Sequence, residues 1–294
     1  MNKVLVIVGP TGVGKSSFAV ECAKKYNGEI ISGDSIQVYK GLDIGSAKIK
    51  ENEKDNINHY LIDIKEPTDN YSVKEFQDLA RIKIQEIQNN NKLPIICGGT
   101  GLYIKALLYD YYFYEEDEKD NQYEGLSNEE IYKRIEKIDP ESLENIHINN
   151  RKRLVRALNI IEKHQTNITE IKQSQEHKLL YDAKIIGLTK PKEIINSMVD
   201  KRVDQMINEG LLDEIKSLLN KGVTFDNQSM QAIGYKEFKD YFNKTKTKEE
   251  CINDVKTHTH QFIKRQYTWF KNQMNVEWYD NKEDALISIN KWYE

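Results

Sequence analysis

The first residues able to do chemistry lie in a glycine-rich loop near the start of the chain. This loop matches the phosphate-binding pattern G-x-x-x-x-G-K-[ST]. Its glycines can turn backbone N–H groups toward an anion, and a helix beginning near Lys15 would add the positive end of its dipole. Lys15 offers a charge to terminal phosphates, and the Ser16 hydroxyl is a metal ligand for Mg²⁺. The alternative is a glycine-rich turn that binds nothing. The predicted phosphate-binding residues are Gly9, Pro10, Thr11, Gly12, Val13, Gly14, Lys15 and Ser16.

Two further polar residues follow short apolar runs. Asp34 comes after the run at 28–32, where a carboxylate can ligate a metal or take a proton from a nucleophile. An aspartate that only shapes a turn is the alternative. Thr100 comes after two glycines and can hydrogen-bond a ligand, or merely cap the helix that follows. Asp63 resembles the metal-binding carboxylate of nucleotide hydrolases, but Ile64 continues its apolar run and no catalytic glutamate follows.

A cationic ridge is predicted on the helical segment 149–161. Leu154, Leu158 and Ile161 fall on one apolar stripe. The basic residues that project elsewhere are Arg151, Lys152, Arg153 and Arg156. Such a ridge suits a phosphodiester backbone, and a solvated helix face explains the same pattern.

These residues need a common scaffold. Short apolar runs at 4–8, 28–32, 60–64, 94–97 and 183–188 alternate with helical patterns. This alternation predicts an α/β fold, a P-loop NTPase-like parallel sheet flanked by helices. Because ligands bind at the carboxyl ends of parallel strands, the phosphate loop, Asp34, Ser35 and residues 98–100 should converge on one cleft.

The pattern of strands and helices is interrupted once. Residues 111–148 are rich in charge and tyrosine and predict a small helical insertion or lid. The catalytic core is then discontinuous, 1–110 and 149–294, with a helical C-terminal part and an edge strand at 275–280.

Composition narrows the class of protein. No apolar stretch of this 294-residue chain approaches the roughly 20 residues of a membrane span, and the first predicted strand leaves no room for a signal peptide, so we expect a cytoplasmic protein. Three well-separated cysteines predict neither a disulfide framework nor a zinc site. The net charge of -4 argues against broad nucleic-acid binding but allows a local basic groove.

Together these blocks resemble the bacterial tRNA dimethylallyltransferases, also called tRNA isopentenyltransferases, of the IPP transferase family. The blocks in the family's order are GPTGVGKSS, ISGDSIQVYKGLDIGSAK, HYLIDI, YSVKEFQDLA, GGTGLYIKALL, IHINNRKRLVRAL, RVDQMINEGLLDEI, QAIGYKEF and FIKRQYTWF. They cover nearly all of the chain. The resemblance implies transfer of a dimethylallyl group from dimethylallyl diphosphate to N6 of the adenosine at tRNA position 37, beside the anticodon, with Mg²⁺ assisting.

The resemblance also implies residue roles. The phosphate loop and Arg202 would hold the diphosphate. Asp34 would accept a hydrogen bond or proton from the amine of a flipped-out adenine, and Thr100 would touch the reaction centre. Implied contacts to the anticodon stem-loop of tRNA are Asp34, Ser35, Ile36, Gln37, Thr100, Asn150, Arg151, Lys152, Arg153 and Leu154. We expect a monomer that does not bind membranes.

One departure and two rival functions stand beside this resemblance. Relatives carry a tRNA-contacting arginine soon after the segment KALL, whereas here no arginine occurs between Arg81 and Arg134; Tyr123 is the residue that could take its place. A small-molecule or nucleotide kinase would use the same loop to bind ATP and close a lid over its acceptor. An RNA-binding module switched by a nucleotide would bind both ligands without forming a product.

Overall fold

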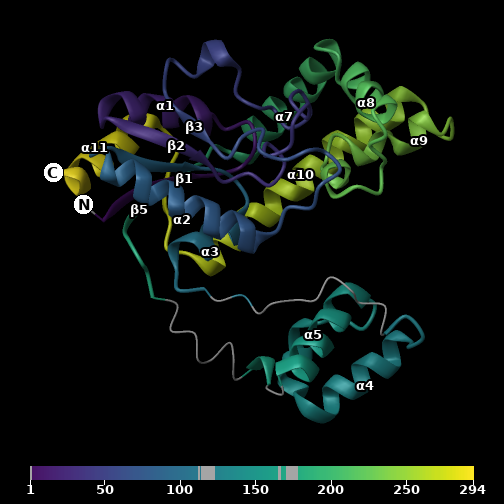
Figure 1. The fold of residues 1–294 in the computed structure, drawn as a ribbon. Helices are drawn as coiled ribbons and strands as arrows, with labels where there is room; N and C mark the ends of the chain where they lie inside the picture. Colours follow the sequence, from purple (N-terminus) through teal and green to yellow (C-terminus); the bar gives the residue numbers. More distant parts are fainter. Residues whose placement is uncertain (1, 112, 114–122, 165–166, 170–177) are drawn as a thin grey trace. The chain divides into compact units, whose positions relative to one another are not determined.

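The computed structural model describes residues 2–111, 113, 123–164, 167–169 and 178–294. The chain forms two compact units (Figure 1). The larger unit comprises Met1–Leu108 and Leu179–Glu294, and the smaller unit is Tyr109–Lys178.

A parallel sheet forms the centre of the larger unit. Its six strands are β1 (Lys3–Val8), β2 (Gly28–Ser32), β3 (His59–Tyr60), β4 (Leu93–Cys97), β5 (Asp182–Leu188) and β6 (Glu277–Tyr279). Their order is β3-β2-β4-β1-β5-β6, and every neighbouring pair is parallel. The predicted α/β class is confirmed, as is the edge strand at 275–280. This order places β2, β4 and β1 side by side, so the segments that follow them leave the same edge of the sheet.

Helices cover both faces of this sheet (Figure 1). They are α1 (Lys15–Lys25), α2 (Val73–Asn89), α3 (Gly101–Leu108), α7 (Lys192–Asn208), α8 (Leu211–Asn220), α9 (Lys239–Phe242), α10 (Lys248–Gln273) and α11 (Lys282–Tyr293), with 3₁₀ turns at Glu51–Glu53, Gln228–Gln231 and Lys236–Phe238. Leu5 and Ile7 of β1 pack with α1 and α11 in one apolar cluster. Val4 and Val6 alternate with them and are equally buried. Strands buried on both faces need continuous apolar sequence, which explains the run at 4–8.

Two predicted elements are shorter than their apolar patterns. The strand predicted at 60–64 ends at Tyr60, because Leu61 and Asp63 have φ of 60° and 56°, outside the extended region. In the helical C-terminal part, the single helical pattern predicted over 191–219 divides into α7 and α8 at Gly210, whose φ is 99°. Asp63 therefore does not follow a strand end, which removes the resemblance to a nucleotide hydrolase.

The smaller unit is helical, with an apolar core of its own. It contains α4 (Asn128–Ile138), a 3₁₀ turn at Pro140–Asn145 and α5 (Arg151–His164). The core residues include Ile131, Ile135, Leu154, Leu158 and Ile161. The predicted insertion ended at 148, but the smaller unit extends to Lys178 because α5 packs its apolar stripe against α4. The predicted boundary is wrong by one helix.

Two findings bear on the class of protein. Within the part of the chain that the structure describes, no helix is both long and apolar enough to cross a bilayer. Cys22, Cys97 and Cys251 are free thiols, and Cys22 and Cys251 are buried.

The segments after β2 and β4 lie so close together at Gly98 that no space is left for a side chain there. A Cβ at this position would lie 2.3 Å from the Gly33 carbonyl oxygen and 2.4 Å from its carbon. We expect Gly98→Ala to lower the free energy of unfolding by about 1–3 kcal/mol, because backbone atoms must move apart. Gly125→Ala is the matched control, since a Cβ there meets nothing within 4 Å. Urea denaturation measures both variants; equal midpoints would contradict this contact.

Candidate active site at the carboxyl edge of the sheet

The phosphate loop joins β1 to α1. Gly9, Gly12 and Gly14 have φ of 143°, 82° and 95°, conformations that side chains rarely adopt. Gly14 is the N-cap of α1, so the loop leads directly into a helix N-terminus. Lys15 Nζ donates to the Pro10 carbonyl oxygen at 2.8 Å, which folds the side chain back over the loop. The arrangement is that of an anion-binding loop, and Ser16 lies exposed at its end.

The charges at this edge influence one another. Burial lowers the pKa of the Lys15 ammonium to about 8, and the Arg202 guanidinium of α7 acts in the same direction. The negative charge of Asp34 opposes this shift. Burial also lowers the pKa of Arg202, again opposed by Asp34. Arg202, predicted to lie near the diphosphate, is thus within electrostatic reach of both Lys15 and Asp34.

The ends of three neighbouring strands hold these groups together. The Gly98 N–H donates to the Ile7 carbonyl oxygen at 3.2 Å, and the Gly33 N–H donates to the Cys97 carbonyl oxygen at 2.8 Å. These bonds join the segments after β1, β2 and β4. Burial raises the pKa of Cys97 to about 11, so its thiol is not a nucleophile at neutral pH. Asp34, Thr100 and the phosphate loop therefore lie along one edge, as the sequence predicts.

Asp34 shapes its own turn and keeps one oxygen for other partners. Its Oδ1 accepts hydrogen bonds from the N–H groups of Ile36 and Gln37, at 2.8 and 3.3 Å. Oδ1 therefore has the turn-forming role that was the alternative for this residue. Oδ2 is the atom with which Asp34 would contact a substrate. Residues 34–37 are half-buried. The Thr100 carbonyl oxygen accepts from the Ile104 N–H, so Thr100 also begins α3.

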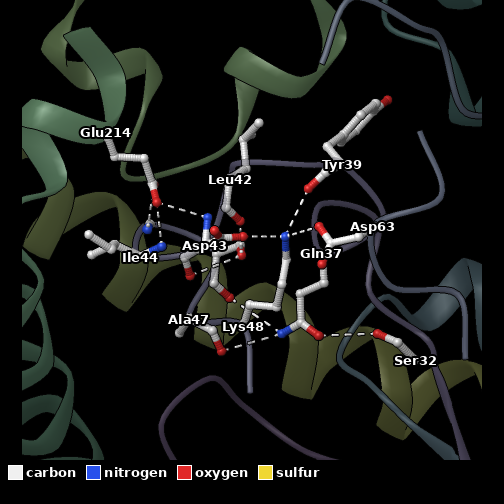
Figure 2. Close-up of polar contacts among 12 residues, drawn as sticks. Ser32, Gln37, Tyr39, Leu42, Asp43, Ile44, Ala47, Lys48, Asp63 and Glu214 are labelled. Carbon is white, nitrogen blue, oxygen red and sulfur yellow. Dashed lines mark hydrogen bonds and ion pairs between the residues drawn. The ribbon is translucent and has the colours of Figure 1, made fainter. Parts of the chain in front are cut away.

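The loop from Asp34 to Lys48 is fixed by internal polar contacts (Figure 2). Ser32 Oγ donates to Gln37 Oε1 at 3.2 Å, and Gln37 Nε2 donates to the Ser46 carbonyl oxygen at 3.4 Å. Lys48 Nζ lies 2.5 Å from carboxylate oxygens of both Asp43 and Asp63 and donates to the Tyr39 carbonyl oxygen. Asp63 is therefore an ion-pair partner of Lys48.

The predicted cationic ridge is partly structural. The Arg151 guanidinium donates to the carbonyl oxygens of Leu126 and Tyr123 and to Asn128 Oδ1, at 2.7 to 3.1 Å. Leu154 is completely buried in the core of the smaller unit. The side chains of these two residues therefore stabilise the smaller unit, and contact between these residues and RNA stays a prediction.

Three other positions of this segment are exposed. They are Asn150, Lys152 and Arg153, and contact between them and RNA stays a prediction. Tyr123, the substitute for the missing arginine, is buried, and its hydroxyl donates to Glu162 Oε2 at 2.7 Å. A packing role fits Tyr123 better than an RNA contact.

The donor set fits a magnesium ion that is bound mainly by a ligand. No cluster of three or more histidine, cysteine, aspartate or glutamate residues occurs among the residues described. Mg²⁺ commonly takes one or two protein ligands and completes its shell with phosphate oxygens and water. The exposed Ser16 hydroxyl beside the anion-binding loop meets that requirement.

Comparisons with known proteins decide the family. The family model described as IPP transferase matches residues 37–273. The tRNA dimethylallyltransferase of Anoxybacillus flavithermus is 47% identical over 289 residues, covering 97% of this chain and 93% of that protein. The chain belongs to the IPP transferase family.

Solved structures of this family are also similar. The tRNA delta(2)-isopentenylpyrophosphate transferase of Staphylococcus epidermidis has a TM-score of 0.74 and 41% identity, covering 99% of both chains. A eukaryotic dimethylallyltransferase acting on tRNA has a TM-score of 0.84 and 30% identity, covering 95% of this chain and 74% of the other. The fold is therefore that of the IPP transferases.

Sequence reasoning missed Glu214, which anchors the loop of this IPP transferase family member (Figure 2). Its Oε2 accepts from the N–H groups of Asp43 and Ile44, at 2.9 and 2.8 Å. Its Oε1 accepts from the Gly45 N–H at 3.2 Å and the Tyr235 hydroxyl at 2.7 Å. The only sequence signal was that the blocks EGLLDEI and QAIGYKEF recur in the family. The structure shows that they hold the loop after β2.

Removing the Glu214 carboxylate should release that loop. We expect Glu214→Ala to speed amide hydrogen exchange at residues 43–45 and to lower the free energy of unfolding by about 1–3 kcal/mol, because three backbone N–H groups and the Tyr235 hydroxyl lose their acceptor. Hydrogen-exchange mass spectrometry measures the first effect. Asp213→Ala, at the exposed neighbouring position, is the matched control. Unchanged protection at 43–45 would show that water replaces the carboxylate without consequence.

The low pKa of Lys15 predicts pH-dependent binding of inorganic diphosphate. Below pH 8 the ammonium is charged and affinity is complete, whereas above pH 8 the affinity should fall by up to about tenfold per pH unit. Lys15→Arg stays charged, so it reports only the titration of the ligand itself. Isothermal titration calorimetry from pH 7 to 9.5 compares the two proteins. Parallel curves would contradict the pKa assigned to Lys15.

Proposed function

We propose that this protein transfers a dimethylallyl group from dimethylallyl diphosphate to N6 of adenosine 37 of tRNA, releasing diphosphate. The observation that carries the proposal is that an anion-binding loop, a carboxylate and Thr100 lie together at one edge of the sheet, in a member of the IPP transferase family. In this proposal the phosphate loop binds the diphosphate of the donor. The acceptor attacks carbon, and both phosphates depart together as one leaving group.

The donor side uses two cations. Lys15 and Arg202 are withdrawn from water near each other, and that placement is unfavourable until an anion arrives. A diphosphate group is such an anion, and its negative charge increases as the carbon–oxygen bond breaks. The loop therefore stabilises the departing diphosphate more than the bound donor. Mg²⁺, held by the Ser16 hydroxyl and diphosphate oxygens, would neutralise the remaining negative charge.

The acceptor side uses Asp34. As the bond between N6 and the first carbon of the dimethylallyl group forms, the bridging carbon–oxygen bond breaks and N6 must lose a proton. Asp34 Oδ2 takes this proton, since Oδ1 holds two backbone N–H groups. The adenine must leave the stacked anticodon loop to reach that oxygen.

RNA binding involves both units in this proposal. Ser35, Ile36 and Gln37 follow Asp34 directly and approach the nucleotides around the extruded base. Lys152 and Arg153 of the smaller unit are exposed cations suited to phosphodiester groups. We propose that one copy of the chain binds the anticodon stem-loop.

Asp34→Asn separates proton transfer from loop geometry. Asparagine Oδ1 can still accept from Ile36 and Gln37, but the amide cannot take the N6 proton. We expect kcat to fall by about 10²–10⁴-fold while the Kd for tRNA changes little. The assay uses labelled dimethylallyl diphosphate, Mg²⁺ and unmodified tRNA, followed by nucleoside analysis.

Controls for this assay address both rival functions. Labelled ATP in a parallel reaction tests for a kinase, and unmodified tRNA without donor tests for binding alone. An Asp34→Asn variant that prenylates at the parental rate removes the proton-acceptor role. Phosphate transfer from ATP, with no prenylated nucleoside, overturns the proposed function itself.

A further inference from the structure

A buried glutamine of α10 contacts the segment that carries Thr100. Gln266 has only 8% of its surface exposed, and its Nε2 donates to the Gly99 carbonyl oxygen at 2.9 Å. A Cβ on Gly99 would lie 2.4 Å from that nitrogen, so only glycine leaves room for the amide. The same Cβ would lie 3.5 Å from the Gly9 carbonyl oxygen, which places Gly99 between Gly9 of the phosphate loop and Gln266.

About one helical turn further along α10, Trp269 lies against Gly101, the residue after Thr100. A Cβ on Gly101 would lie 2.1 Å from the indole ring, so the ring rests directly on the backbone of the first residue of α3. Gln266 and Trp269 therefore bracket Thr100 through the residues before and after it. Both side chains come from a helix far away in the sequence, and they contact the residues on either side of Thr100.

The second atom of the Gln266 amide is unusual. Gln266 Oε1 is buried and has no hydrogen-bond partner among the residues described. An unpaired buried carbonyl destabilises a fold, so an apolar side chain of the same length would serve packing alone at least as well. What the amide adds is the bond from Nε2 to Gly99.

We propose that Gln266 is a positioning residue for prenyl transfer: its amide fixes Gly99 beside the phosphate loop and so positions the backbone that carries Thr100. This inference rests on the proposed function for its kinetic part. Gln266 does not touch the substrates; it acts through the backbone on which Thr100 sits. Misplacing a reacting group by about 1 Å is enough to slow a reaction by about 100-fold.

The variant Gln266→Met keeps the length of the side chain and removes both polar atoms. We expect kcat to fall by about 10- to 100-fold, the KM for dimethylallyl diphosphate to stay within about twofold, and Tm to change little. The unpaired Gln266 carbonyl is removed, which stabilises the fold, while the buried Gly99 carbonyl loses its donor, which destabilises it. Gln273→Met is the matched control on the same helix, because its exposed amide bonds only Lys105 Nζ of α3 in the contacts seen here.

Two further measurements separate positioning from general packing. Adding Gln266→Met to Thr100→Val should cost no further activity, since the group being positioned is already gone. Amide exchange at residues 99–104 should accelerate in Gln266→Met and not in Gln273→Met, whatever reaction the protein catalyses.

Each outcome bears on one claim. Parental kcat or unchanged exchange in Gln266→Met overturns the positioning role, and so does a fully additive loss in the double variant. A parental protein that forms no prenylated nucleoside overturns the proposed function instead, and the exchange measurement then still decides whether Gln266 holds the turn.

Discussion

Lys15 and Arg202 are both partly buried at one edge of the sheet, and among the residues that the structure describes neither forms an ion pair within 4.0 Å. Burial lowers the pKa of both side chains, and Asp34 compensates for only part of that cost. A site built in this way favours a ligand that brings several negative charges at once. It also favours a reaction in which those charges increase, which is the situation when a diphosphate leaves carbon. The Asp34 carboxylate opposes the lowering of both pKa values. In the proposed reaction the same carboxylate takes the proton from the attacking amine.

The groups that do chemistry come from the first hundred residues, but distant residues hold them in place. Glu214 of α8 accepts three consecutive N–H groups of the loop after β2, and Gln266 of α10 fixes the turn after β4. The segments that Glu214 and Gln266 bind contain glycine, and the lack of a side chain at Gly45 and Gly99 allows Tyr235 and Gln266 to approach the backbone closely. The C-terminal helices are therefore part of the active site, although none of their residues except Arg202 is proposed to contact a substrate.

Local patterns in the sequence were sufficient for the sheet, the phosphate loop and most helices. The apolar run at 4–8 and the glycine pattern that follows it can be recognised locally, because the strand and the loop that they form depend mainly on the residue types within those segments. The strand predicted at 60–64 ends early because Leu61 and Asp63 adopt positive φ, which an apolar pattern does not reveal. Arg151 and Leu154 were assigned to RNA through the family resemblance of their segment; helical periodicity placed Leu154 on the apolar stripe but does not reveal the hydrogen-bond partners of Arg151. Glu214 and Gln266 could not be found at all, since their partners are 169 to 171 and 167 residues away.

The central claim is that the phosphate loop binds a leaving group and that carbon is attacked. The most direct measurement uses dimethylallyl diphosphate with ¹⁸O in the oxygen that bridges carbon and phosphorus, together with unmodified tRNA. Mass spectrometry of both products then locates the label. The account predicts that all of the ¹⁸O leaves in diphosphate, with one diphosphate released for each N6-(dimethylallyl)adenosine formed. Label retained in an isoprenoid alcohol, or inorganic phosphate released in place of diphosphate, would contradict it.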